Sequence, residues 1–275
     1  MHIWCWITWR ARTSCDSSDV AEELALLELA KAAATRAATR LLDRFAPPDL
    51  SYVHSQDLPR EVKAAADTAL ERDILDTLAA SGIPVLSEES GLVPGTRATN
   101  LWFIVDPLDG TFNFVKGLGS SAVSIALWRE QTPVFGVIYD LAKRQLAWGG
   151  PELGACIDGR AMSVSSTATA AQASICTGFP VRFDVEDESA MRSFIRLLRP
   201  YAKVRMLGSA AMSLLQVARG SADVYLERSI MLWDVAAGIA LVEGAGGTVL
   251  RERRQHEWCY DVVAANTALL AHVQR

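Results

Sequence analysis

The sequence is poor in cysteine and carries no excess of basic charge. Its five cysteines are an odd number at wide spacing, without a Cys-x-x-Cys pair, so neither a disulfide framework nor a zinc site is expected. Reduced thiols in a cytoplasmic protein are the expectation. Lys and Arg number 27 against 32 Asp and Glu, a formal net charge of -5. This balance lacks the basic footprint of a nucleic-acid-binding surface, so no polymeric nucleic acid is expected as a partner.

Long apolar runs are also missing, and no association with a membrane is expected. The tryptophan-rich segment 1–13 is apolar but is interrupted by Arg10 and Arg12, with no basic residues ahead of it. It makes a poor signal peptide. We therefore predict that residues 1–18 are an extension outside the fold. The chain is 50% hydrophobic and 21% charged, which is an ordinary globular composition.

Helical and strand patterns interleave along the chain. Apolar residues at three- and four-residue steps predict helices over 19–41, over 62–78 ending at Gly82, and later over 186–198, 209–218 and 234–242. Short apolar runs predict strands at 84–86, 101–105, 122–128, 134–139, 145–148, 174–178, 203–207, 222–226, 248–250 and 262–264. No linker separates them. We predict one unit over 19–275, made of two packed α/β halves at about 19–180 and 181–275.

The segment from Trp102 to Thr111 places two carboxylates at the end of an apolar strand. The strand delivers Asp106, and Asp109-Gly110 is a strong turn signal. Backbone N–H groups of Gly110 and Thr111 would lie beside the carboxylates. Mg²⁺ prefers carboxylate, water and phosphate oxygens, so this arrangement fits Mg²⁺ holding a phosphate. From this spacing alone, however, an ordinary surface turn is the commoner explanation, because Asp and Gly are frequent in turns.

Two further acidic residues follow the same logic. Glu88 comes directly after the predicted strand 84–86, although a Glu-Glu pair in a loop is usually just solvated. Asp234 lies at the start of a helix of small apolar residues. The helix dipole stabilises a carboxylate there, and capping the helix would be its ordinary role. Either residue alone is a weak signal.

Taken together, these segments resemble the inositol monophosphatase family. Trp102 to Phe114 is similar to the first signature of the family, and Trp233 to Gly247 is similar to the second. Glu88 falls where the family has an upstream metal-binding glutamate. The resemblance covers about Asp19 to Asn266. It implies a layered α/β/α/β/α sandwich of the inositol monophosphatase and fructose-1,6-bisphosphatase type, with the site between its halves, and a homodimer.

The resemblance further implies a Mg²⁺-dependent phosphomonoesterase with two bound ions, or three. The metal ligands would be Glu88, Asp106, the carbonyl of Leu108, Asp109 and Asp234. Glu88 and Thr111 would activate the attacking water, with Asp67 hydrogen-bonded to Thr111. The substrate would contact Asp109, Gly110, Thr111, Ala210 and Glu227. Charge agrees with a metal site, because clustered carboxylates repel one another without a cation.

Three further segments bear on where the substrate would bind. The segment 208–211 opens a helix with small residues and free N–H groups, yet a plain Ser cap at Ser209 explains it equally well. Glu227 follows 222–226 and is expected at a strand end, while Arg205 is interpreted as a surface charge.

The family commonly has Val-Thr where this chain has Val62-Lys63, and its usual upstream lysine is not evident in 51–59. Lys63 would instead pair with Asp67 one helical turn away, which puts the role of Asp67 and a third metal in doubt.

The expected substrate is a small phosphorylated metabolite, inositol monophosphate first, because Phe112-Asn113-Phe114 resembles the inositol-phosphate members of the family. The segment 84–89 is instead similar to 3'-phosphoadenosine 5'-phosphate phosphatases, so a 3'(2'),5'-bisphosphate nucleotidase is an alternative. Histidinol phosphate and fructose bisphosphate are others. A non-catalytic regulatory or binding role on the same fold is a different class of answer. The presence of all four acidic ligands favours catalysis.

Overall fold

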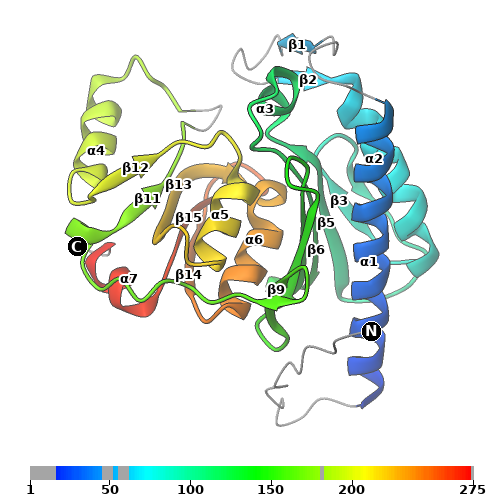
Figure 1. Ribbon diagram of the computed structural model, residues 1–275. Coiled ribbons are helices and arrows are strands. Elements are labelled where there is room, and N and C mark those ends of the chain that lie inside the picture. Colours follow the sequence, from blue (N-terminus) through cyan, green and yellow to red (C-terminus); the bar gives the residue numbers. More distant parts are fainter. Residues whose placement is uncertain (1–16, 45–51, 55–61, 180–182, 274–275) are drawn as a thin grey trace.

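The computed structural model describes residues 17–44, 52–54, 62–179 and 183–273. Most of the predicted extension 1–18 and most of 51–59 lie outside the described residues. The described chain forms an eight-stranded sheet, a five-stranded sheet and a two-stranded ribbon (Figure 1). Helices α1 and α2 cover one face of the large sheet, α5 and α6 lie between the sheets, and α4 and α7 cover the far face of the small sheet. This arrangement confirms the expected α/β/α/β/α sandwich.

The first layer is helical. Helix α1 spans Ser17–Arg44 and α2 spans Ala65–Leu78, followed by the short η1 at Ala79–Ser81 and a left-handed Gly82. The prediction was wrong at the start of α2, because 62–64 form strand β2 (Val62–Ala64), which pairs with β1 (Tyr52–His54). The apolar spacing of four continues through Val62, but pairing with a neighbouring strand overrides it. Lys63 therefore lies in a strand, outside the helix that was predicted to carry it with Asp67.

The large sheet is mostly antiparallel. Its order is β10 (Arg160–Ala161), β9 (Gly154–Ile157), β8 (Gln145–Gly150), β7 (Thr132–Asp140), β6 (Ala122–Arg129), β5 (Leu101–Asp109), β3 (Val85–Ser87) and β4 (Gly91–Val93). Strand β5 runs parallel to β3 and antiparallel to β6. It continues beyond the predicted end at Val105, because a shift in register between Asp106 and Asp109 accommodates Pro107. Helix α3 (Thr111–Lys116) follows at once.

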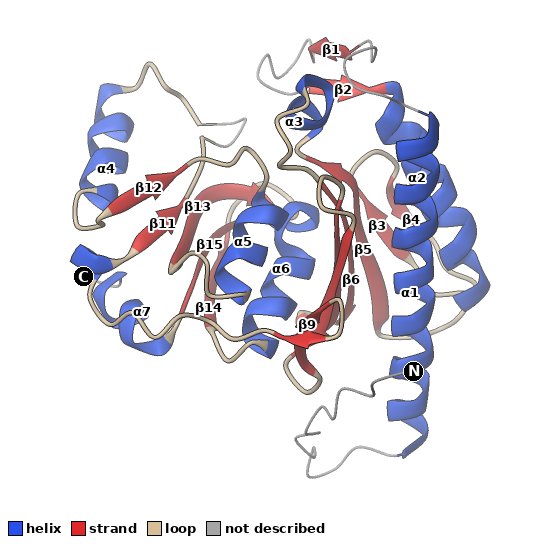
Figure 2. Cartoon of the chain, viewed as in Figure 1, coloured by secondary structure: helices blue, strands red, loops and turns tan. Residues whose placement is uncertain are grey.

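The small sheet has the order β12 (Lys203–Arg205), β11 (Ser174–Cys176), β13 (Val224–Met231), β15 (Cys259–Ala265) and β14 (Thr248–Arg253). It begins in the chain at Ser174, shortly after η2 (Ala170–Gln172) and ahead of the expected division near 180. Its outer face carries α4 (Glu188–Leu198) and α7 (Thr267–Val273), and Figure 2 shows both helices on the side away from the large sheet.

The central layer consists of α5 (Ala210–Ala218) and α6 (Leu232–Gly244). Every residue of α6 from Val235 to Val242 is buried. A helix that is apolar all round is typical of a position between two other layers, and α6 packs against strands of both sheets. The start of α6 is thereby held against the large sheet at β5.

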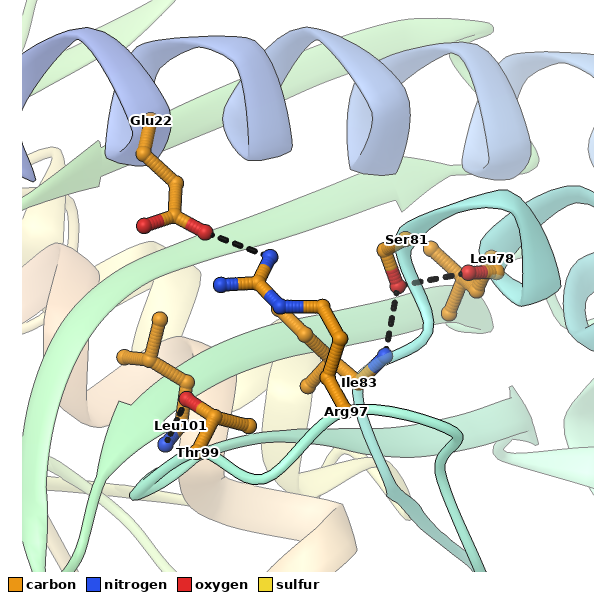
Figure 3. A network of polar contacts seen from close by, with 7 residues as sticks. All are labelled: Glu22, Leu78, Ser81, Ile83, Arg97, Thr99 and Leu101. Atoms are coloured by element: carbon orange, nitrogen blue, oxygen red, sulfur yellow. Dashed lines mark hydrogen bonds and ion pairs between the residues drawn. The ribbon is translucent and has the colours of Figure 1, made fainter.

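Polar contacts tie α1 to the large sheet. The Arg97 guanidinium, in the loop between β4 and β5, lies 2.6 Å from a Glu22 carboxylate oxygen of α1 (Figure 3). Beside it, the Leu101 N–H that opens β5 donates to the Thr99 hydroxyl. At the next residue of α1, the Glu23 carboxylate accepts a hydrogen bond from the Arg129 guanidinium at the end of β6, at 2.9 Å. In the part of the chain that the structure describes, no helix is long and apolar enough to cross a membrane, and Cys156, Cys176 and Cys259 are buried thiols.

Candidate active site

Three carboxylates from three elements meet beside the large sheet. Glu88 directly follows β3, Asp106 lies in β5, and Asp234 lies in the first turn of α6. One carboxylate oxygen of each lies within 4.8 Å of the others. The meeting of the first two follows from the parallel pairing of β3 with β5, where the Glu88 N–H donates to the Val105 carbonyl at 3.1 Å. Helix α6 then brings the third from more than a hundred residues away.

Asp234 does not cap α6. The helix begins at Leu232, the preceding Met231 makes no side-chain cap, and Asp234 is the third helical residue. The interpretation of Asp234 as an ordinary cap is therefore wrong. Its carboxylate lies in the first turn, where the helix dipole favours negative charge, and is available to the acidic cluster.

The electrostatics of this cluster point to a cation. Burial raises the pKa of Asp106 well above its usual range, and the charges of Glu88, Asp109 and Asp234 raise it further. Burial likewise raises the pKa of Asp234, with Glu88, Asp109 and Glu227 adding to the effect. Several buried carboxylates with one sign of charge are costly unless a positive charge joins them. Carboxylate oxygens are the hard donors that Mg²⁺ prefers, so the residues present fit that ion.

Asp109 is held differently from the three. Its Oδ2 accepts a 2.5 Å hydrogen bond from the Ser209 hydroxyl and a 2.6 Å hydrogen bond from the Ala211 N–H. Ser209 is the cap of α5, and its Oγ accepts from the Met212 N–H. Burial raises the pKa of Asp109 to about 6, while these donors lower it. The Ala211 N–H, expected to be free for a ligand, is thus bound to Asp109, and Ala210 is the first residue of the helix.

The turn after Asp109 has a demanding backbone. Gly110 adopts φ +81°, and a Cβ at this position would lie 2.6 Å from the Ser120 carbonyl oxygen. The Thr111 hydroxyl that follows has two acceptors in reach, Asp67 Oδ1 at 2.9 Å and the Leu108 carbonyl at 3.0 Å. Asp67 lies buried in the first turn of α2, 44 positions away in the sequence. The Leu108 N–H donates to Asp106 at 3.0 Å, which orients that carboxylate.

Glu227 lies inside β13 and not at a strand end, so that prediction was wrong. Pairing of β13 with β15 resumes at Ile230 after a shift in register that follows Glu227. Burial raises the pKa of Glu227 to about 7, with a contribution from the charge of Asp109, while a hydrogen bond from Tyr225 lowers it. Arg205 is exposed and its guanidinium donates to the Val204 carbonyl, as expected for a surface charge.

Two residues that support this site carried no role in the sequence analysis. Asn113 Nδ2 donates to the carbonyls of Ser120 and Leu207, each at 2.7 Å, and so connects α3 to the segment ahead of α5. Glu71 of α2 accepts from the Ser90 N–H and hydroxyl, which anchors the turn after Glu88. The partners lie 94 and 19 positions away in the sequence, so no local pattern reveals them. The position of Asn113 inside the Asp-Gly-Thr segment was the only available signal.

Comparisons with known proteins place this chain among phosphatase-like sequences and structures over most of its length. A profile of the inositol monophosphatase family matches residues 23–274. The chain is 32% identical over 261 residues to a protein of Pseudomonas aeruginosa named Nus factor SuhB, covering 90% of this chain and 96% of that protein. It is 35% identical over 197 residues to an inositol-1-monophosphatase of Caulobacter vibrioides, and the match covers 68% of this chain and 77% of that protein. The structure of an inositol monophosphatase from Anabaena (Nostoc) has a TM-score of 0.77 at 31% identity, covering 92% and 94%.

Proposed function

The chain belongs to the inositol monophosphatase family, and we propose from that premise that it is a Mg²⁺-dependent phosphomonoesterase acting on a small phosphorylated polyol, inositol monophosphate first. The observation that carries the proposal is the meeting of Glu88, Asp106 and Asp234, whose oxygens lie within 4.8 Å of one another. Asp106 is buried and the other two are half-buried, and a divalent cation would offset the repulsion among three such carboxylates. The motif that continues as Phe112-Asn113-Phe114 supports the choice of inositol phosphate.

Two Mg²⁺ ions would be held by Glu88, Asp106, the Leu108 carbonyl, Asp109 and Asp234. When bound, such ions lower the pKa of a coordinated water and stabilise the attacking and leaving oxygens of a phosphoryl transfer. Asp109 would have a dual role, with its Oδ2 held by α5 and its other oxygen serving as the metal ligand. Ser209 and Ala211 then keep that carboxylate in one orientation.

The attacking water would be oriented by Thr111 and Glu88. The Thr111 hydroxyl has a single proton, which Asp67 or the Leu108 carbonyl accepts, so its oxygen can accept a hydrogen bond from the water. Glu88 would receive the proton of the water. On the substrate, the phosphate would bind the N–H groups of Gly110 and Thr111, and the hydroxyls of the alcohol would contact Asp109, Ala210 and Glu227.

The experiment that tests this proposal is phosphate release with and without Mg²⁺. The substrates are inositol 1-phosphate, 3'-phosphoadenosine 5'-phosphate, histidinol phosphate and fructose 1,6-bisphosphate. We expect Mg²⁺-dependent release, fastest from inositol 1-phosphate. Asp106→Asn should lower kcat more than about 100-fold, since loss of a direct ligand should exceed the cost of losing an outer contact. Asp76→Asn, an exposed acid on α2, is the matched control. Wild-type activity in Asp106→Asn would refute the metal assignment.

A non-catalytic role is the second candidate. It is favoured by the name Nus factor carried by a relative that matches 90% of this chain. The same assay separates the two, because a folded protein that releases no phosphate from any of the four substrates would favour the binding role. The retained set of acidic residues makes the catalytic role the primary proposal.

A further inference from the structure

The carboxylate of Glu227 is held from within its own strand. The Tyr225 hydroxyl donates to Glu227 Oε2 at 3.0 Å, and the two residues lie two positions apart on β13, so both side chains are on the same face of the small sheet. That face packs against the central helices, and Tyr225 is fully buried within it. Burial and the charge of Glu227 together raise the pKa of Tyr225 well above its usual range, so the tyrosine remains protonated and donates.

The neighbouring strand leaves room for the same carboxylate. Strand β11 runs parallel to β13 with Cys176 opposite Tyr225, so the chain continues to Gly178 beside Glu227. A Cβ at Gly178 would lie 3.1 Å from Glu227 Oε1 and 3.3 Å from both Cδ and Oε2. These contacts are tighter than an ordinary van der Waals contact, so any side chain at position 178 would press on the carboxylate.

We propose that Tyr225 and Gly178 are positioning residues for substrate recognition, which hold Glu227 so that its Oε1 accepts a hydroxyl of the substrate's alcohol. The inference rests on the proposed function and deepens it by naming the two residues that position Glu227 for the alcohol of the substrate. The substrate group that faces Oε1 must be a hydrogen-bond donor, because a carboxylate only accepts hydrogen bonds and its Oε2 already accepts from Tyr225. A second phosphate here would meet Glu227 and the nearby charge of Asp109, and the like charges disfavour a bisphosphate.

A merely structural role for Tyr225 makes different predictions. A buried tyrosine hydroxyl needs an acceptor in any case, so its loss alone would change stability and would affect all substrates alike. A positioning role affects only substrates whose alcohol carries a hydroxyl for Glu227. Under a positioning role, the effect of losing the Tyr225 hydroxyl also disappears in a variant that lacks the Glu227 carboxylate.

The test compares inositol 1-phosphate with p-nitrophenyl phosphate, whose leaving group has no further hydroxyl, in the presence of Mg²⁺. For Tyr225→Phe we expect the KM for inositol 1-phosphate to rise about tenfold, the size of one hydrogen bond to a charged group. Its kcat and both constants for p-nitrophenyl phosphate should change less than about twofold, within the range of a surface change. The control is Tyr139→Phe, at another buried tyrosine on the opposite side of the large sheet, which should leave KM and kcat unchanged for both substrates.

A double-mutant cycle and a second variant complete the test. In a Glu227→Gln background, Tyr225→Phe should raise the KM for inositol 1-phosphate by less than about twofold, because the two residues act as a pair. Gly178→Ala should reproduce the inositol-specific rise, and it carries the test if Tyr225→Phe does not fold. Equal effects on both substrates, or an undiminished effect in the Glu227→Gln background, would overturn the positioning role. Failure of the wild type to release phosphate from inositol 1-phosphate with Mg²⁺ would instead overturn the proposed function.

Discussion

Ser209 and Asp109 link the start of α5 to the end of β5, and the hydroxyl of the first donates a 2.5 Å hydrogen bond to Oδ2 of the second. Asp109 ends β5 of the large sheet, whereas Ser209 caps α5 in the later half of the chain. The Ala211 N–H donates to the same oxygen. The start of α5 and the carboxylate of Asp109 are therefore joined by two hydrogen bonds.

Ser209→Ala should weaken both the helix and the site. Loss of the cap should lower the free energy of unfolding by about 1 kcal/mol. Loss of the bond to Asp109 should also lower kcat/KM by about tenfold or more, because a hydrogen bond to a charged group is removed. The control is Asp187→Ala, which removes the cap of α4. Chemical denaturation should show equal losses of stability in the two variants. Phosphate release should fall in Ser209→Ala only. Equal activities in the two variants would contradict the link between the Ser209 hydroxyl and the acidic site.

Gly110→Ala should be severely destabilising. The position combines φ +81° with a Cβ that would lie 2.6 Å from the Ser120 carbonyl oxygen. Gly246→Ala is the matched control, because Gly246 has φ +84° but open space around its Cβ position. We expect Gly246→Ala to cost about 1 kcal/mol from backbone conformation alone, and Gly110→Ala to cost clearly more, with loss of phosphatase activity. Similar unfolding free energies for the two variants would show that the close contact relaxes freely.

Thr111→Val should remove turnover while leaving the fold intact. The change keeps the shape of the side chain but removes the hydroxyl that lies 2.9 Å from Asp67. We expect kcat to fall by about 10²–10⁴, the usual contribution of a positioned proton-transfer group. Thr111→Ser retains the hydroxyl and should keep most of the rate. If Thr111→Val and Thr111→Ser have the same kcat, the hydroxyl does not orient the water.

The stability of the metal-free protein should fall as pH rises. The pKa of Asp109 is raised from 3.8 to about 6, and burial and like charge also raise the pKa of Asp106 and Asp234. When the pKa of a carboxyl group is higher in the folded protein than in the unfolded chain, the folded protein binds more protons at every pH between those two pKa values. This contribution is fully present below about 3.8 and is lost as pH rises through about 6 and above.

Thermal unfolding in a chelator at about pH 5.5 and about pH 7.5 measures this effect. We expect the midpoint to be lower at the higher pH by about 3 °C or more, the shift that 1 kcal/mol produces in a chain of this size. Asp234→Asn should reduce the difference, whereas the exposed Asp76→Asn should not. Added Mg²⁺ should restore stability at the higher pH in the wild type. A metal-free protein that is more stable at the higher pH would contradict the assignment of the cluster.

Local patterns were sufficient for most elements, whereas the acidic residues were selected as metal ligands through the resemblance to the family. The helix over α1, the strands of the large sheet and the Ser209 cap follow from periodicity and capping chemistry, which act over a few residues. The predictions failed where a distant partner decided the outcome. Residues 62–64 form a strand because β1 pairs with them, and Glu227 lies inside a strand because β15 continues to pair beyond it.

The sequence by itself determined that carboxylates would follow β3, occupy the end of β5 and open α6, because turn and helix signals lie next to each of them. Only the tertiary structure decided how they meet and what holds them. The parallel pairing of β3 with β5 sets Glu88 beside Asp106, and burial of α6 between two sheets brings Asp234 to both. The bonds of Asp109 to α5, of Asn113 to Leu207 and of Tyr225 to Glu227 depend on orientation in three dimensions, which local sequence preferences do not specify.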